Sequence, residues 1–176
     1  RWHDWWFNHS GGIGELCQYR HPFSSGLDDS PLWDLGMPVV SPDLNTYLCL
    51  QTESLAKIAD IIGLPDDAAR WRDRADRIAQ AMQESLWDAE LGLFRALHLG
   101  QQPIATLTPF SLLPLWTGRY SQDIVARLVA HLQNPQTFWP AWPIPTVALN
   151  DPAFDPKQMW RGPVWANINY LFVEAL

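Results

Sequence analysis

The sequence is short of basic residues and of long apolar runs, and each shortage excludes a class of protein. It has 12 Lys and Arg against 19 Asp and Glu, which gives a net charge of −7. A nucleic-acid surface requires a basic stripe, so we expect no nucleic-acid partner. No stretch approaches the roughly 20 consecutive apolar residues of a membrane span, so we also expect no membrane partner.

Cysteine is scarce as well, with only Cys17 and Cys49. Two isolated cysteines are too few for a disulfide framework or a zinc site, and we expect both to be buried free thiols. Free thiols weakly favour a reducing compartment, and no charged-then-apolar leader is visible. We therefore expect a cytoplasmic location, no cofactor and no metal, and the oligomeric state stays open.

Tryptophan, by contrast, is abundant, with 11 residues in 176. The C–H face of a pyranose ring packs against flat aromatic rings, while its hydroxyl groups bind planar polar side chains beside them. Large apolar rings also simply fill hydrophobic cores. A carbohydrate site is therefore one of two interpretations of this composition.

Helical periodicity organises most of the chain. Apolar residues recur at the 3.6-residue spacing of a helix, with Ser41 and Ser121 as expected N-caps of two of the helices. The expected helices cover Trp2 to Asn8, Pro42 to Ile62, Asp66 or Asp67 to Trp87, about 109–116, Gln122 to Leu132, and a last one beginning near Pro163. A hairpin is expected within 88–104, and the seven prolines of 135–163 rule out a long helix there.

Helix pairs that alternate with long loops predict an all-α helical toroid, with an irregular helical bundle as the alternative. The length suits one domain, so we interpret residues 1–176 as a single domain fragment. The chain begins at Arg1 rather than Met, and it ends inside the apolar run 170–176. We expect both ends to be truncations of a longer domain.

Two adjacent carboxylates, Asp28 and Asp29, mark the first candidate site. They lie in the segment 21–34 between a glycine and a Ser-Pro turn, with the aromatic residues Phe23 and Trp33 on either side. Carboxyl groups close to one another and to apolar walls suit a proton donor, because both surroundings favour the protonated form. The alternative is an acidic turn in which Asp29 caps the residues that follow.

A tryptophan-rich segment at 159–170 marks the second candidate site. Trp160 and Trp165 flank Arg161 and Gly162, a proline stands at a helix start, and two asparagines follow. An aromatic wall, a guanidinium and two amides suit the recognition of sugar hydroxyls. The alternative is a helix N-terminus with two core tryptophans.

Together these segments resemble the glycosidases of glycoside hydrolase family 63, the related trehalases and the mannosylglycerate hydrolases. Ser25-Gly-Leu-Asp28 is similar to their Ser-Gly-x-Asp motif, and 160–169 is similar to their Trp-x-Gly-Pro-x-Trp-x-Asn-x-Asn segment. Further segments occur in the same order as in that group: Trp5-Trp6, 42–45, 86–88 with 92–94, and 151–155. The resemblance therefore covers essentially the whole chain.

The resemblance implies part of an (α/α)6 toroid and an inverting mechanism, in which one carboxylic acid protonates the leaving oxygen and a second carboxylate activates water. It implies that Asp28 is the general acid. It further implies a substrate site for α-linked glucosyl or mannosyl saccharides. The candidate substrate-binding residues are Trp33, Trp160, Arg161, Gly162 and Trp165.

The chain departs from the family pattern in three places. Ser24 stands where the family often has Glu before Ser-Gly-x-Asp. The family's base is a Glu in a Glu-x-Tyr-like motif, which the resemblance places beyond residue 176, so Glu174 is not assigned as the base. The stretch 8–15 has too few carboxylates for the calcium loop of some relatives.

Two other interpretations stay open. A non-catalytic carbohydrate-binding fold would use the same aromatic residues without the second carboxylate. A helical interaction module would instead bury Trp33, Trp160 and Trp165 side by side, away from any cleft.

Overall fold

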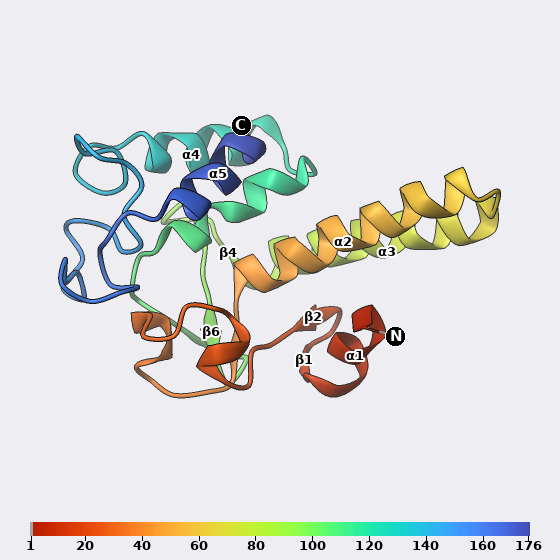
Figure 1. The fold of residues 1–176 in the computed structure, drawn as a ribbon, viewed down its shortest axis with the longest axis horizontal. Helices are drawn as coiled ribbons and strands as arrows, with labels where there is room; N and C mark the ends of the chain where they lie inside the picture. Colours follow the sequence, from red (N-terminus) through yellow and green to blue (C-terminus); the bar gives the residue numbers. More distant parts are fainter. Residues whose placement is uncertain (1) are drawn as a thin grey trace.

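The structure is a computed structural model that describes residues 2–176, and within this range it contains five α-helices (Figure 1). Short strands and 3₁₀ turns connect them. The helices are α1 (Trp2–His9), α2 (Pro42–Ile61), α3 (Pro65–Leu86), α4 (Gln122–Leu132) and α5 (Ala166–Ala175). The strands are β1 (Gly12–Ile13), β2 (Leu16–Cys17), β3 (Val39–Val40), β4 (Trp87–Asp88), β5 (Leu93–Phe94), β6 (Leu97–His98) and β7 (Gln102–Pro103).

The long helices α2 and α3 lie side by side and form the elongated part of the molecule in Figure 1. Each begins with a proline in its first turn, where the missing N–H breaks no helical hydrogen bond. Gly63 ends α2 in a Schellman motif, in which its N–H donates to the Asp60 carbonyl and the N–H of Leu64 donates to the Ala59 carbonyl. Gly63 adopts the required left-handed conformation, with φ of 75°.

The two faces of α3 differ in composition. Its buried side carries small and apolar residues, and its outer side carries exposed ion pairs such as Arg70 with Asp67 and Arg77 with Asp73. Exposed pairs of this kind contribute little to stability, typically about 0–1 kcal/mol. The charges on this face therefore need no functional explanation.

The region expected to hold one hairpin forms two. Strands β4 and β5 pair antiparallel, and β6 pairs with β7 on one side and with β3 on the other. Gly92 and Gly100, with φ of 75° and 69°, lie in the two tight connections. The β3–β6 pairing connects the entry of α2 to the hairpin region.

The segment expected to be a helix at 109–116 is instead a pair of 3₁₀ helices, η3 (Pro109–Ser111) and η4 (Leu113–Thr117). Pro114 lies inside the expected helix and removes a backbone donor that an α-helix would need there. The proline-rich stretch that follows α4 has no helix, as expected. The last helix begins at Ala166, three residues beyond Pro163, because Trp165 is still extended and Val164 forms a bridge with Pro145.

Four phenylalanines form the centre of the core between these parts. Phe94 comes from β5, Phe110 from η3, Phe138 from the proline-rich stretch and Phe172 from α5, and all four are fully buried. Burying a side chain of this size stabilises a fold by about 1.5–3 kcal/mol relative to exposing it. The irregular C-terminal part is therefore packed onto the helices. Over residues 2–176 no helix is long and apolar enough to cross a membrane.

Candidate active site

The loop that contains the two adjacent carboxylates is held by its own hydrogen bonds. It runs between the 3₁₀ helices η1 (Pro22–Ser24) and η2 (Pro31–Trp33). The Ser25 hydroxyl donates to the Pro22 carbonyl at 2.5 Å and accepts from the Leu27 N–H at 3.0 Å. Gly26, with φ of 73°, takes the left-handed conformation at the reversal. The loop is therefore ordered without regular secondary structure.

The two adjacent carboxylates have different surroundings. Asp29 is half-buried, and its Oδ1 accepts a hydrogen bond of 2.8 Å from the backbone N–H of Trp160. Asp28 is exposed, and within residues 2–176 its side chain has no hydrogen bond or ion pair. One carboxylate thus joins two loops, while the other is free to meet a ligand.

The hydrogen bond from Trp160 brings the two predicted site segments together across 131 residues of sequence. Trp160 is buried and Trp165 is half-buried, and their rings stack with centroids 4.3 Å apart and planes inclined by 7°. The indole N–H of Trp165 donates to the Met159 carbonyl at 2.8 Å. The pair is a rigid aromatic unit next to the acidic loop.

Arg161 and Gly162 hold the tryptophan segment in place. The guanidinium of Arg161 makes a two-pronged ion pair with Asp34, with 2.9 Å between Nη1 and Oδ2. Hydrogen bonding to Asp34 raises the pKa of Arg161, so the side chain stays cationic. Gly162 is buried, and a Cβ there would lie 2.9 Å from the Asp155 carbonyl oxygen. Arg161 therefore joins the two segments, and Gly162 allows close packing within the tryptophan segment.

Trp33 is not exposed beside the carboxylates. It is 7% exposed, and its indole N–H donates to the Leu27 carbonyl at 2.6 Å. Trp33 therefore lies beneath the loop that carries Asp28.

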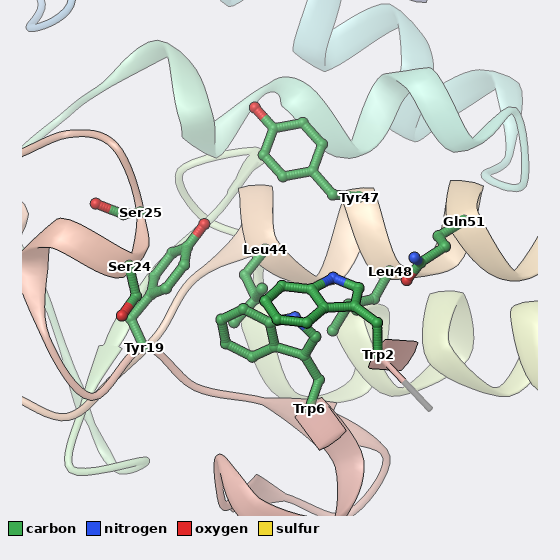
Figure 2. Close-up of a pocket in the computed structure, with 9 residues that line it drawn as sticks. All are labelled: Trp2, Trp6, Tyr19, Ser24, Ser25, Leu44, Tyr47, Leu48 and Gln51. Carbon is green, nitrogen blue, oxygen red and sulfur yellow. The ribbon is translucent and has the colours of Figure 1, made fainter. Parts of the chain in front are cut away.

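A pocket of about 350 Å³ opens on one side of this loop (Figure 2). It is lined by Trp2 and Trp6 of α1, by residues of α2 that include Tyr47 and Gln51, and by loop residues that include Ser24. Every lining residue is uncharged: Trp2, Trp6, Tyr19, Ser24, Ser25, Leu44, Tyr47, Leu48 and Gln51. None of the residues predicted for the site lines this pocket, although Ser24 is the last residue of η1 and Ser25 belongs to the same loop as Asp28.

A buried polar cluster at the start of α2 is the feature that sequence reasoning missed. Asp43 is 1% exposed, and its carboxylate accepts hydrogen bonds from the hydroxyls of Tyr19 and Ser41. Ser41 stands at the N-cap position as expected, but its hydroxyl binds Asp43 instead of a backbone N–H. The sequence offered two signals here: Ser41, Asp43 and Asn45 are three polar residues within five positions, and 42–45 is one of the segments that occur in the family's order.

Within residues 2–176, no group of three or more His, Cys, Asp or Glu side chains is placed to hold a metal ion.

Comparisons with known proteins show which proteins this chain resembles. The chain is 25% identical over 171 residues to a probable mannosyl-oligosaccharide glucosidase of Schizosaccharomyces pombe, covering 90% of this chain and 20% of that protein. It is 22% identical over 238 residues to a mannosylglycerate hydrolase of Rubrobacter radiotolerans, covering 99% and 53%. The chain thus spans about half or less of the length of these relatives.

A solved structure of a mannosylglycerate hydrolase is also similar to this chain. The family 63 mannosylglycerate hydrolase of Thermus thermophilus in complex with glucose superimposes with a TM-score of 0.83 at 25% identity, covering 98% of this chain and 52% of that one. The sequence profile of the mannosylglycerate hydrolase MGH1-like glycoside hydrolase domain matches residues 1–176. This chain therefore belongs to the mannosylglycerate hydrolase MGH1-like glycoside hydrolase family, and its domain is of the family 63 type.

Proposed function

We propose that this chain is part of the catalytic domain of an inverting α-glycosidase, with Asp28 as the general acid on a partial (α/α)6 toroid. The observation that carries the proposal is the contrast between Asp28 and its surroundings. Asp28 is exposed and makes no hydrogen bond or ion pair within residues 2–176, whereas Leu27 and Asp29 on either side are both held. An exposed carboxyl on a backbone held on both sides suits a catalytic group, because a glycosidic oxygen can reach it while the backbone restricts its position.

The proposed chemistry uses two carboxyl groups. Asp28 donates its proton to the glycosidic oxygen as the bond between that oxygen and the anomeric carbon breaks. A water molecule attacks the anomeric carbon from the opposite face, and its proton passes to a second carboxylate about 6.5–9.5 Å away. Asp28 is then reprotonated from solvent, and the released sugar has the inverted configuration.

The tryptophan segment is proposed to form the aromatic wall of the substrate site, against which the sugar ring packs. Trp165 is the more exposed ring of the stacked pair, so it presents a flat apolar face, with Trp160 behind it. Arg161 pairs with Asp34 after the loop of Asp28, while Gly162 packs within the tryptophan segment against Asp155. Relatives named as a glucosidase and a mannosylglycerate hydrolase make α-glucosyl and α-mannosyl compounds the proposed substrates.

The substitution Asp28→Asn tests the assignment in the complete protein that contains this chain. We expect kcat on an α-glycoside with an alkoxide leaving group to fall by about 10²–10⁴-fold, which is the usual contribution of a proton donor. Hydrolysis of the corresponding glycosyl fluoride should fall much less, because fluoride leaves with little help from an acid. NMR of the fresh product should detect the inverted anomer.

Asp66→Asn is the matched control, since Asp66 is another exposed carboxyl, in the first turn of α3. Its kcat should equal that of the wild type on both substrates. Equal activity of Asp28→Asn and wild type on the alkoxide substrate would remove Asp28 from the acid role. Release of the retained anomer would exclude the inverting mechanism.

The pocket of Figure 2 favours a second candidate, a non-catalytic carbohydrate-binding fold. Its lining combines indole rings with hydroxyl and amide groups and carries no charge, which suits a neutral saccharide. Trp6→Ala should then weaken the binding of a neutral disaccharide in a calorimetric titration, although the protein hydrolyses none. Hydrolysis that depends on Asp28 would exclude this candidate.

A further inference from the structure

Asp43 is a carboxylate that the proposed chemistry does not use, buried at the first turn of α2. It is 1% exposed, and within residues 2–176 it forms no ion pair. Burial raises its pKa, while the hydrogen bonds from Ser41 and Tyr19 partly oppose this effect. A buried carboxyl without a cation is costly unless its hydrogen bonds are satisfied, so the two hydroxyls and the backbone N–H groups of Asp43 and Leu44 stabilise it.

Tyr19 connects this carboxyl to Val39 and to Trp33. Its hydroxyl donates to Asp43 Oδ2 at 3.0 Å, and its backbone N–H and C=O both pair with Val39. Its ring meets Trp33 edge to face, with centroids 5.7 Å apart and planes inclined by 81°. The Tyr19 ring therefore packs directly against the Trp33 ring.

Trp33 in turn contacts the loop that carries Asp28. Its indole N–H donates to the carbonyl of Leu27 at 2.6 Å, one residue before Asp28. On the far side of Asp28, the carboxylate of Asp29 holds the N–H of Trp160. The backbone of Asp28 is thus bounded by two hydrogen bonds, one reached from the α2 entry and one from the tryptophan segment.

Asn45 strengthens the connection between α2 and the strand that leads to the loop. Its side-chain amide accepts from the Cys17 N–H at 2.8 Å and donates to the Cys17 carbonyl at 3.0 Å. The same side chain donates to the Ser41 carbonyl at 2.9 Å. The start of α2 therefore holds the main chain of Cys17 and the side chain of Tyr19 together.

We propose that Asp43, Tyr19 and Trp33 form a buried positioning relay that fixes the loop of the catalytic acid from beneath. None of the three touches substrate in this scheme, and each acts through its neighbour on the Leu27 carbonyl. The relay rests on the proposed function, because it places Asp28 for proton transfer. Removing a hydrogen bond of the relay lowers the fraction of molecules in which the carboxyl of Asp28 is correctly placed. It leaves the stacked rings of Trp160 and Trp165 unchanged.

The test compares Tyr19→Phe, Trp33→Phe and Tyr120→Phe in the complete protein. Tyr19→Phe removes only the hydroxyl that binds Asp43, and Trp33→Phe removes the N–H that binds Leu27. Tyr120→Phe is the matched control, because Tyr120 is also buried and loses one hydrogen bond, to the Ala79 carbonyl, in a different part of the fold.

Hydrogen exchange of the loop provides a readout that does not depend on activity. The amide of Ser30 donates to the Leu27 carbonyl, so its protection reports on the loop. We expect exchange in peptides covering 22–33 to accelerate about five- to tenfold in Tyr19→Phe and Trp33→Phe, as for the loss of one buried hydrogen bond. The control should not change it. Unchanged exchange in both site variants would overturn the relay.

The kinetic readout separates positioning of an acid from general loss of structure. On the alkoxide substrate, we expect both site variants to lose about tenfold in kcat with KM within about twofold, because placement and not binding is impaired. On the glycosyl fluoride they should retain wild-type kcat. Equal losses on the two substrates would assign the residues a merely structural role and overturn the relay. Failure of the acid assignment would show separately, in Asp28→Asn.

Discussion

Cys17 and Cys49 show how burial sets the chemistry of a single residue. They are 1% and 0% exposed, and neither forms a disulfide, so the expectation of buried free thiols is confirmed. Burial raises the pKa of Cys49 to about 12 and also raises that of Cys17. The thiolate is the reactive form, so neither side chain is poised for nucleophilic or redox chemistry.

Thiol labelling tests this at the residue scale. At pH 8 we expect the native protein to react with a thiol-specific reagent at less than about one hundredth of the rate of an unfolded thiol, because a pKa of about 12 leaves very little thiolate. In denaturant, Cys17 and Cys49 should both react at once. Separate Cys→Ser variants assign each signal. Rapid labelling of the native protein at either position would contradict this account.

The segment 155–165 shows how a loop without regular structure holds its shape at the element scale. The Asp155 N–H donates to the Arg161 carbonyl at 2.8 Å, and Gly162 packs directly against the Asp155 carbonyl. A Cβ at Gly162 would lie 2.9 Å from that oxygen and 3.0 Å from the Phe154 ring. The requirement for glycine here is one of space.

We expect Gly162→Ala to lower the free energy of unfolding by about 1–3 kcal/mol, the usual cost of forcing an extra carbon into a packed site. Urea denaturation measures it. Val164→Ala is the control, because that side chain is 43% exposed two residues away, and it should change stability by no more than about 0.5 kcal/mol. Equal stability of the wild type and Gly162→Ala would mean that Asp155 yields to the added group.

At the scale of the whole molecule, two side-chain contacts join the N-terminal loop to the tryptophan segment. Asp29 accepts from the Trp160 N–H across 131 residues of sequence, and Arg161 pairs with Asp34 across 127. The first contact is part-buried, whereas the side chains of the ion pair are 26% and 51% exposed. Solvent screens the second contact far more than the first.

A double-mutant cycle with Asp34→Ala and Arg161→Ala should therefore give a coupling energy below about 1 kcal/mol, falling further in roughly 1 M salt. Asp29→Ala should cost more, about 1.5–3 kcal/mol, because it removes a charged acceptor from a part-buried N–H. Urea unfolding at low and high salt measures the stability of all the variants in this comparison. A coupling above about 2 kcal/mol that salt leaves unchanged would contradict this order.

The sequence by itself determined the local elements and the family. The 3.6-residue spacing predicted α1 to α4 to within one or two residues, and the Ser121 hydroxyl accepts from the Ile124 N–H as expected. These signals are local, since a cap or a helical face depends on residues within a few positions. The ordered motifs indicated the family, which the profile match confirms.

Only the tertiary structure decided which of two adjacent carboxylates is free. It joined Asp29 to Trp160, left Asp28 exposed, and placed Trp33 beneath the loop with its N–H on Leu27. It also directed the Ser41 hydroxyl to Asp43 instead of the helix end. Burial and hydrogen-bond partners depend on segments up to 131 residues apart, and no local pattern records which of them will meet.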